Sequence, residues 1–361
     1  MGISRKEALE CFQSDDLIGI GMEADAVRQR LHPEGVVSYA IEAAIDCATV
    51  MGGGTREGNH PAVGCAHRLF DAIRETIELG STGVRLCGGV GCALKSSDME
   101  WFEGILRGIR QRFPSLWIET LSAAEILSLA NGSGLGLRET IARLGDAGLD
   151  SIASDDAQAQ GSPRCCSTAE WIAVHRAAHG LGMSTVATMS FGLGAGEAGL
   201  GEIGAGDAIE QRVDLLTAVR QLQQETGGFT AFIPRSLPSR NPATGGCDEP
   251  TAVEQLKTLA IARVFLDNIQ NIQWSGAAQG LKVLQMGLRF GANDAGSVTP
   301  VAHGATKWSG KQVGNGATSA GVESAAAAAN HPAEEDLRRI IRGAGFQPVQ
   351  RDIPYRTMFL N

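Results

Sequence analysis

Val36-Val37-Ser38-Tyr39-Ala40-Ile41-Glu42-Ala43-Ala44-Ile45 is the first of the apolar segments that decide the fold. Further short segments of strand character follow it along the chain, at residues 83–87, 116–121, 149–153, 184–191, 230–233 and 269–274. Amphipathic helices are predicted between them, for example at residues 99–112, 168–179 and 209–226. Strands that alternate with helices indicate a parallel sheet, which is either a (β/α) barrel or a doubly wound open sheet.

The composition is that of a globular protein with ample core. The chain has 361 residues, of which 43% are hydrophobic and 20% charged, and we expect one domain over residues 1–361. The net charge of −9, without any Lys/Arg cluster, argues against a nucleic-acid partner. No apolar run of membrane-spanning length and no signal peptide are visible. We therefore expect a cytoplasmic protein whose eight cysteines are reduced thiols or ligands.

Three segments stand apart from the repeating pattern. Residues 1–35 read as an N-terminal helical lead-in. The Gly-rich insertion 192–206 follows a strand end, where it is either a lid over the site or a tolerated surface loop. Residues 304–330 form a Gly/Ala-rich segment for which flexibility is expected.

Several unusual sequence strings occur one after another along the chain. They include Gln224 to Pro234, Gln279-Gly280-Leu281-Lys282-Val283, Leu288 to Asp294, and Gly345 to Asp352. In these strings the chain resembles the futalosine branch of the radical SAM enzymes, the family of cyclic dehypoxanthinyl futalosine synthase of menaquinone biosynthesis. The resemblance extends over nearly the whole chain and implies a radical-SAM-like (β/α) TIM-type barrel with its active site at the carboxyl ends of the strands.

The chain departs from this family at its defining motif. The family carries Cys-x3-Cys-x2-Cys, three thiolates that hold a [4Fe-4S] cluster and leave one iron for S-adenosylmethionine. This chain has Met51, Thr55 and Gly58 at the matching places. A thioether, a hydroxyl and a hydrogen do not replace anionic thiolates on iron. We therefore expect no cofactor: no [4Fe-4S] cluster, and S-adenosylmethionine bound weakly or not at all.

Other departures place charged residues at the predicted barrel mouth. They are Glu119, which stands with Thr120 where relatives tend to have His-Ala, Asp155 and Asp156, where relatives have a Gly-rich run, and Arg235, where relatives have an aromatic residue. These four are the candidate catalytic residues, since carboxylates serve acid/base chemistry and arginine binds carboxylate or phosphate. Alternatively, one aspartate caps a helix while the other is solvated, and Arg235 pairs with Asp155 or Glu119.

The resemblance also implies a set of ligand-binding residues. Amide and carboxylate groups suit ribose hydroxyls and base edges, so a nucleoside-like ligand fits this set. For Asn293 and Asp294, a turn within 291–296 is the competing interpretation. Thr188 and Ser190 alternate with Met189 on their strand and can face inward, and a packed polar core explains them equally well. The candidate ligand-binding residues are Cys87, Gly88, Gly89, Thr188, Gln273, Trp274, Gln279, Asn293 and Asp294.

A metal site is the less favoured reading of the cysteines and histidines. Cys47, Cys65, Cys87 and Cys92 fall near the first two strand ends, but their spacing matches no zinc motif, and buried inert thiols explain them better. His175 and His179 lie one helical turn apart, and we interpret them as surface residues near a helix C-terminus.

Two classes of function remain open from sequence. The first is a non-radical enzyme that binds a nucleoside-like or other small polar metabolite in the barrel mouth. The second is a catalytically silent paralogue that serves as partner or regulatory subunit of a cluster-bearing homologue. A small-molecule ligand is expected in the first case; a homo-oligomer or a complex with that homologue is possible in the second. No membrane partner is expected in either.

Overall fold

The computed structural model describes residues 2–50, 66–87, 96–153, 166–192, 209–236, 239–240, 247–248, 250–298 and 333–359. Helices α1 (Arg5–Gln13) and α2 (Leu17–Leu31) precede the first strand and form the expected helical lead-in. Ser4 and Glu7 form a capping box at the start of α1, which satisfies backbone N–H groups that have no partner within the helix. Asp16 caps α2 through Gly19 N–H.

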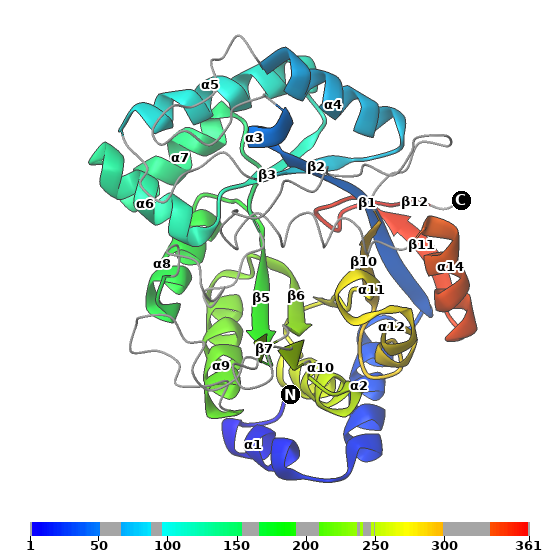
Figure 1. Ribbon diagram of the computed structural model, residues 1–361. Coiled ribbons are helices and arrows are strands. Elements are labelled where there is room, and N and C mark those ends of the chain that lie inside the picture. Colours follow the sequence, from blue (N-terminus) through cyan, green and yellow to red (C-terminus); the bar gives the residue numbers. More distant parts are fainter. Residues whose placement is uncertain are drawn as a thin grey trace.

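The strands follow one another around a curled parallel sheet (Figure 1). Its first group is β1 (Val36–Asp46), β2 (Gly83–Cys87), β3 (Trp117–Thr120) and β4 (Ser151–Ile152). The second group is β5 (Thr185–Phe191), β6 (Phe229–Ser236) and β9 (Asn271–Ile272). β10 (Asp294–Val298) pairs with β1, and a parallel bridge between Gln273 and Asp294 joins the two groups. The predicted TIM-type barrel is thereby confirmed.

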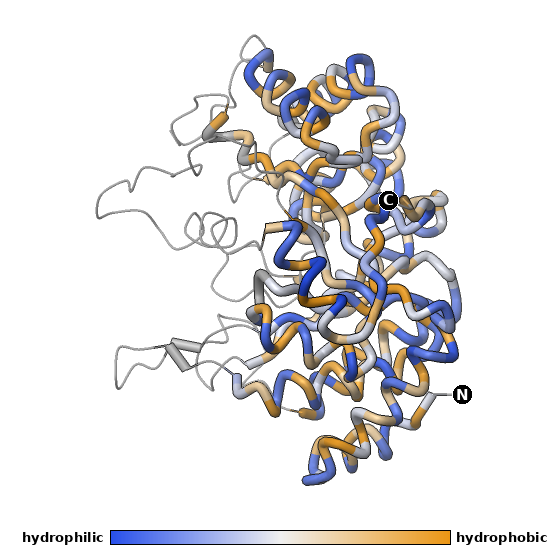
Figure 2. Tube along the Cα trace, turned by 90° about the vertical axis from the view of Figure 1, so that its right-hand side faces the viewer, coloured by the Kyte–Doolittle hydropathy of each residue, from blue (hydrophilic) through white to orange (hydrophobic). Residues whose placement is uncertain are grey.

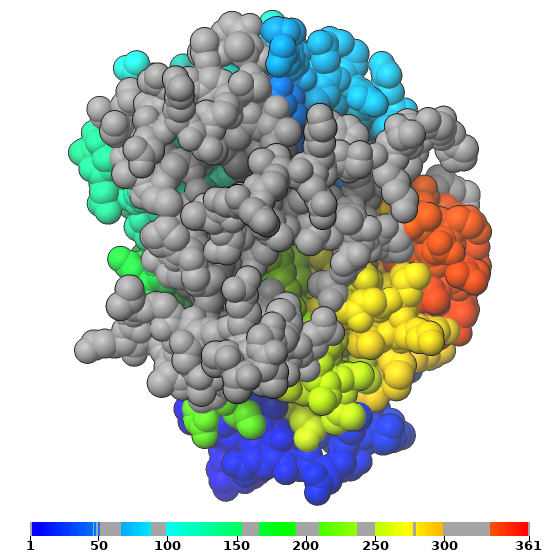
Figure 3. Space-filling model, viewed as in Figure 1, coloured from blue at the N-terminus to red at the C-terminus, as the bar shows by residue number. Residues whose placement is uncertain are grey.

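Helices form an outer ring around these strands (Figure 1). Their hydropathy alternates along the tube in Figure 2, as amphipathic helices require when one face packs on a sheet. The remaining helices are α3 (Cys47–Val50), α4 (Ala66–Glu78), α5 (Ser96–Arg112), α6 (Ala123–Ser133), α7 (Leu137–Ala147), α8 (Thr168–His179), α9 (Ile209–Thr226), α10 (Ala252–Phe265), α11 (Gly276–Gln279), α12 (Leu281–Gly287) and α14 (Glu334–Gly343). α14 packs beside α12, red and yellow in Figure 3.

A strand near residue 350 pairs with β1, the first strand of the barrel. β11 (Gln347–Arg351) pairs parallel with the first half of β1, whereas β2 pairs with its second half. β12 (Met358–Phe359) adds to β11 in antiparallel direction, and a short hairpin, β7 (Ser239–Arg240) with β8 (Cys247–Asp248), lies apart. Between β4 and β5 no strand pairing occurs among the described residues. There Ser151 Oγ instead donates a hydrogen bond to the Ser184 carbonyl at 2.9 Å.

Most predicted elements occur where the sequence placed them. Helices α8 and α9 have the predicted bounds, and the other elements differ from prediction by a few residues at their ends. The interpretation of residues 291–296 as a turn was wrong, because Asp294 begins β10 and its side chain is fully buried. The insertion beyond Gly192 and the segment 304–330 lie outside the described residues. No helix of the described ranges is both long and apolar enough to cross a membrane.

His175 and His179 are not surface residues, contrary to the sequence interpretation. His175 is 1% exposed, and its Nδ1 lies 2.8 Å from Thr185 Oγ1, which also lies 2.8 Å from His179 Nε2. Both rings pack around Phe229 at the start of β6. Burial, reinforced by the neighbouring His179, lowers the pKa of His175 to about 3, and burial lowers the pKa of His179 to about 4. The two imidazoles are therefore neutral structural groups between helix and sheet.

This histidine pair should make stability fall with acid. The folded pKa values lie below the ordinary value of 6.5, so the unfolded chain binds more protons between pH 6.5 and 4. The stabilising contribution is complete above pH 6.5 and is lost as the pH falls towards 4, at up to about 1.4 kcal/mol per pH unit for each ring. Urea unfolding at pH 7.5 and 5.0 measures the change.

His175→Gln keeps a hydrogen-bonding amide near Thr185 but cannot titrate, so it should flatten the pH dependence. The matched control is Arg30→Gln, which introduces the same amide at an exposed position on α2 and should keep the wild-type slope. An unchanged slope in His175→Gln would show that this ring is not responsible for the acid sensitivity.

Candidate functional site

Contacts outside the barrel establish which side chains face its interior. Tyr39 of β1 points outward, since its hydroxyl donates a hydrogen bond to Glu334 of α14 at 2.6 Å. Side chains alternate along a strand, so Ser38, Glu42 and Ala44 face inward. The register of the sheet shows which side chains of the neighbouring strands also face inward, because paired residues of parallel strands share a face. Ala44 pairs with Arg85 and Arg85 pairs with Glu119, so all three face the interior.

Arg85 lies between two carboxylates on this inner face. Its Nε lies 3.0 Å from Glu119 Oε1 and its Nη2 lies 3.4 Å from Glu42 Oε1. The negative charge of Glu119, then that of Glu42, raises the pKa of Arg85 above its ordinary value. The Glu119 side chain is 4% exposed, whereas that of Arg85 is 31% exposed, and neighbouring Ala44 is exposed as well. The guanidinium is thus a permanently charged donor that solvent reaches from inside the barrel.

A second buried pair forms the floor of the interior. Asp294 accepts hydrogen bonds from Arg351 Nε at 2.5 Å and Nη2 at 3.0 Å, and also from Ser38 Oγ at 2.5 Å. The Tyr355 ring lies 3.6 Å from the Arg351 guanidinium carbon, and its hydroxyl donates to Gln273 Oε1 at 3.4 Å. Although burial lowers it, the Asp294 carboxylate raises the pKa of Arg351 above its ordinary value. Asp294 is therefore held by the protein itself.

Strands β5 and β6 contribute a different set of inward groups. Phe191 lies beneath the Arg212 guanidinium of α9, outside the sheet, so Ser190 and Thr188 point inward by alternation. They are 2% and 1% exposed, and neither hydroxyl has a hydrogen-bond partner in the part of the chain that is described. Arg235 pairs in register with Ser190 and is half-buried. It forms no ion pair with Glu119, whose ion pair is with Arg85.

Two of the predicted ligand-binding residues face the helices instead. Asn293 Oδ1 accepts hydrogen bonds from Arg263 Nη2 at 2.6 Å and Ile272 N–H at 2.9 Å, so its amide ties β9 to α10. The Trp274 ring packs against Gly287 of α12. Both side chains are buried in the outer layer, which is a structural position and a correction to their predicted role.

Of the remaining candidate site residues, some lie within the part of the chain that the structure describes and others lie outside it. Gln273 stays on the inner face, where it meets Tyr355, while Gln279 Oε1 is buried without a partner in the described structure. Cys87 is half-buried at the carboxyl end of β2, and Cys47 is buried at the start of α3. Asp155, Asp156, Gly88, Gly89, Cys65 and Cys92 lie outside the described residues, as do Met51, Thr55 and Gly58. The described ranges contain no group of three metal-ligating side chains.

Arg85 and Glu42 are the inward-facing residues that sequence reasoning missed. Strands of a parallel sheet are covered on both faces, so a single charge within such a strand must be paired or face a polar interior. That signal was present in 83–87 and 36–45, each an apolar run that contains one charged residue.

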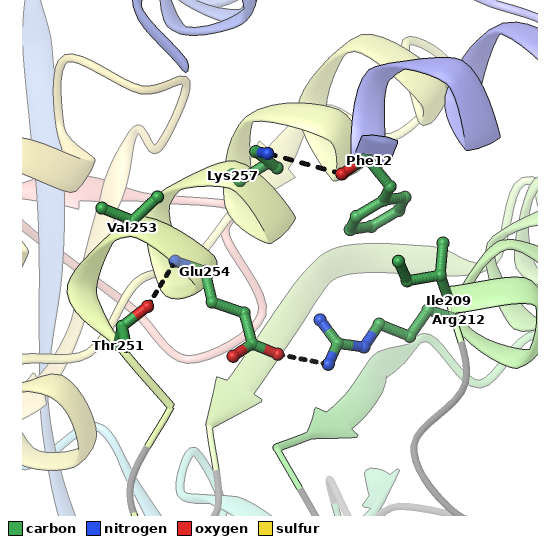
Figure 4. A pocket seen from close by; sticks show the side chains of 7 residues that line it. All are labelled: Phe12, Ile209, Arg212, Thr251, Val253, Glu254 and Lys257. Atoms are coloured by element: carbon green, nitrogen blue, oxygen red, sulfur yellow. Dashed lines mark hydrogen bonds and ion pairs between the residues drawn. The ribbon is translucent and has the colours of Figure 1, made fainter. Parts of the chain in front are cut away.

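A separate cavity of about 350 Å³ lies outside the barrel, among α1, α9 and α10 (Figure 4). Its cations are already engaged: Arg212 Nη2 lies 2.5 Å from Glu254 Oε1, and Lys257 Nζ donates to the Ser14 carbonyl at 2.6 Å. Apolar side chains of Phe12, Ile209 and Val253 complete the lining. This cavity has no free charged group and lies apart from the inward-facing cluster.

Comparison with known proteins identifies relatives along the chain. Residues 226–360 match the family model described as the CofH/MqnC C-terminal region. The chain is 31% identical to cyclic dehypoxanthine futalosine synthase of Streptomyces coelicolor, over 99% of this chain and 86% of that protein. It is 32% identical to 5-amino-6-(D-ribitylamino)uracil–L-tyrosine 4-hydroxyphenyl transferase of Archaeoglobus fulgidus, over 79% of this chain and 77% of that protein.

Solved structures agree with the barrel. The fold is similar to that of methylornithine synthase, with a TM-score of 0.60 and 12% identity over 96% of this chain and 94% of that one. It is also similar to HydG, a maturase of the [FeFe]-hydrogenase, with a TM-score of 0.61 and 11% identity over 99% and 75% of the two chains. At these identities the likeness concerns the fold alone.

Asp294→Ala should destabilise the protein strongly. The substitution leaves the Arg351 guanidinium, 4% exposed, without its carboxylate, and loss of one partner of a buried pair costs about 3–5 kcal/mol. Asp71→Ala, which breaks an exposed pair with Arg74, should change stability little. Chemical denaturation of the two variants measures the difference, and equal losses would contradict a special role for the floor pair.

Proposed function

The chain belongs to the radical SAM family that includes cyclic dehypoxanthine futalosine synthase, and from this premise we propose that it is a cluster-less, non-radical enzyme acting on a small polar, nucleoside-like metabolite inside the barrel. The observation that carries the proposal is the inward-facing cluster of Glu42, Arg85 and Glu119. A charged cluster that solvent reaches from within a barrel is costly for stability alone, and it is useful if a ligand binds there.

The residues of the cluster have distinct roles in this proposal. Arg85 donates hydrogen bonds to an oxygen or ring nitrogen of the ligand, since its charge is fixed and its side chain is accessible. Glu119, nearly fully buried, holds the guanidinium in place and is a positioning residue. Glu42, at 3.4 Å from Arg85, is the carboxylate that can exchange a proton with the ligand.

The names of the two relatives support the ligand class. One is a synthase of cyclic dehypoxanthine futalosine. The other is a transferase whose name includes 5-amino-6-(D-ribitylamino)uracil, a heterocycle that carries a polyhydroxylated chain. Such molecules present many acceptors and hydroxyls, which suit an interior lined by guanidinium, carboxylate, amide and hydroxyl groups. Gln273, whose amide faces the same interior above Tyr355, adds a further polar contact.

The residues of this chain do not fit the cluster that the family implies. Three thiolates are needed to hold it, and the chain has Met51, Thr55 and Gly58 at the family's positions. Of the cysteines on the nearby described elements, Cys47 is buried and Cys87 half-buried, and they form no metal-ligating group of three within the described ranges. The proposed chemistry therefore relies on side chains alone, through electrostatic and acid/base catalysis.

Anaerobic reconstitution with iron and sulfide should leave the purified protein without a [4Fe-4S] cluster. Iron analysis and the visible absorption spectrum provide the measurement, and Cys47→Ser with Cys87→Ser should give the same negative result. About four irons per chain in the wild type would overturn the cluster-less part of the proposal. Loss of that iron in the cysteine variants would identify substitute ligands.

Arg85→Gln should remove ligand binding, and it should also lower the stability of the barrel, because the nearly buried Glu119 carboxylate loses its counter-ion. Calorimetric titration with adenosine and with 5-amino-6-(D-ribitylamino)uracil tests this directly, and we expect at least one of them to bind the wild type. Loss of a charged hydrogen bond weakens binding by about 1.5–3 kcal/mol, which corresponds to about ten-fold or more. Arg85→Lys keeps the charge but loses the planar fork and should bind at an intermediate level.

The matched control is Arg30→Gln, which removes an exposed charge from α2 and should leave binding unchanged. If neither ligand binds the wild type, or if Arg85→Gln binds as well as the wild type, the enzyme proposal fails. Co-purification of the wild type with a cluster-bearing homologue would then favour the partner or regulatory role.

A further inference from the structure

Two hydroxyl groups inside the barrel have no partner in the described structure. They belong to Thr188 and Ser190 of β5, which are 1% and 2% exposed. Buried polar groups are normally hydrogen-bonded, and a buried hydroxyl without a partner destabilises the fold. Both hydroxyls lie on the inner face, two residues apart along one strand, so they form a row of available donors and acceptors in the barrel.

A guanidinium adjoins this row on the neighbouring strand. Arg235 of β6 pairs in register with Ser190, and parallel strands lie about 4.8 Å apart. No hydrogen bond or ion pair engages Arg235 within the described ranges. Arginine with an adjacent hydroxyl is suited to an anionic oxygen, because the planar fork binds carboxylate or phosphate through two donors.

The opposite side of the interior has the reverse charge. On β1 to β3, two carboxylates, Glu42 and Glu119, surround the single guanidinium of Arg85. This cluster bears a net negative charge and repels an anion, whereas Arg235 attracts one. A ligand with one anionic end would therefore be oriented across the barrel, with that end at β5 and β6 and its uncharged polar groups at β1 to β3.

We propose that Arg235, Ser190 and Thr188 form an anion subsite that binds a carboxylate or phosphate group of the metabolite. The proposal rests on the proposed function, since it assigns one end of the same ligand. Arg235 and Ser190 hold the anionic group, and Thr188, two residues deeper on β5, donates to or accepts from a polar group further along the ligand.

The experiment uses inorganic phosphate and succinate as probes, with calorimetric titration of the full chain at constant ionic strength. The wild type should bind at least one anion, and the tighter of the two identifies the group. Arg235→Gln should weaken that binding about ten-fold or more, while Arg30→Gln leaves it unchanged. Ser190→Ala should weaken it less, by about three-fold, and should not lower the melting temperature, because it removes a hydroxyl without a partner.

A second titration separates this inference from the proposed function. Adenosine and adenosine monophosphate differ only in the phosphate, and the monophosphate should bind the wild type about ten-fold more tightly, a preference that Arg235→Gln abolishes. Anion binding that depends on Arg235, without any nucleoside binding, would leave the subsite standing and defeat the proposed function. Absence of anion binding, equal binding by wild type and Arg235→Gln, or a lower melting temperature in Ser190→Ala would overturn the subsite.

Discussion

The buried ion pair between Asp294 and Arg351 is the constraint on which the barrel depends. It links β10 to β11 through two hydrogen bonds, and Ser38 of β1 donates a third to the same carboxylate. Three strands that are far apart in sequence therefore meet at one charge. Because a buried carboxylate without its counter-ion is severely destabilising, neither β10 nor β11 can leave the sheet independently of the other. The C-terminal segment is thus part of the barrel rather than an appendage to it.

The two ends of the barrel interior use polar groups differently. At the floor each charge is matched, and Tyr355 stacks on Arg351 with a left-handed backbone at φ 60° that the network holds in place. Towards the carboxyl ends of the strands, matching is incomplete, as the hydroxyls of Thr188 and Ser190 illustrate. At the floor the buried polar groups all have partners, whereas towards the carboxyl ends of the strands some do not. This arrangement is expected when one end of a fold provides stability and the other end provides binding.

Local patterns in the sequence predicted the elements well. The segment 36–45 and the helix 168–179 could be recognised from apolar periodicity and, for the helix, from Ser167 with Glu170 as a capping box. β10 was missed because Gly291 to Gly296 has the composition of a turn, and only the partner Arg351 explains why Asp294 is buried in a strand. Such a contact joins residues that no local window contains.

The candidate site shows the same limit. Glu119 was recognised as an unusual charge, but its partner Arg85 belongs to the preceding strand, and only sheet register brings them together. His175 was assigned to the surface because helix position alone does not reveal which face packs on β5. Residue type indicated chemistry at individual positions, whereas the pairing that decides a role depended on the register of the sheet.

The position of β1 has a consequence for the order in which the protein is made. β1 is synthesised early, yet its first half pairs with β10 and β11, and Val36 meets Gln347 only near the end of the chain. Until β10 and β11 have both been synthesised, the first half of this apolar strand lacks these neighbours and is open to pairing with other chains. Its pairing is completed late in folding, because it joins residues that are far apart in the sequence.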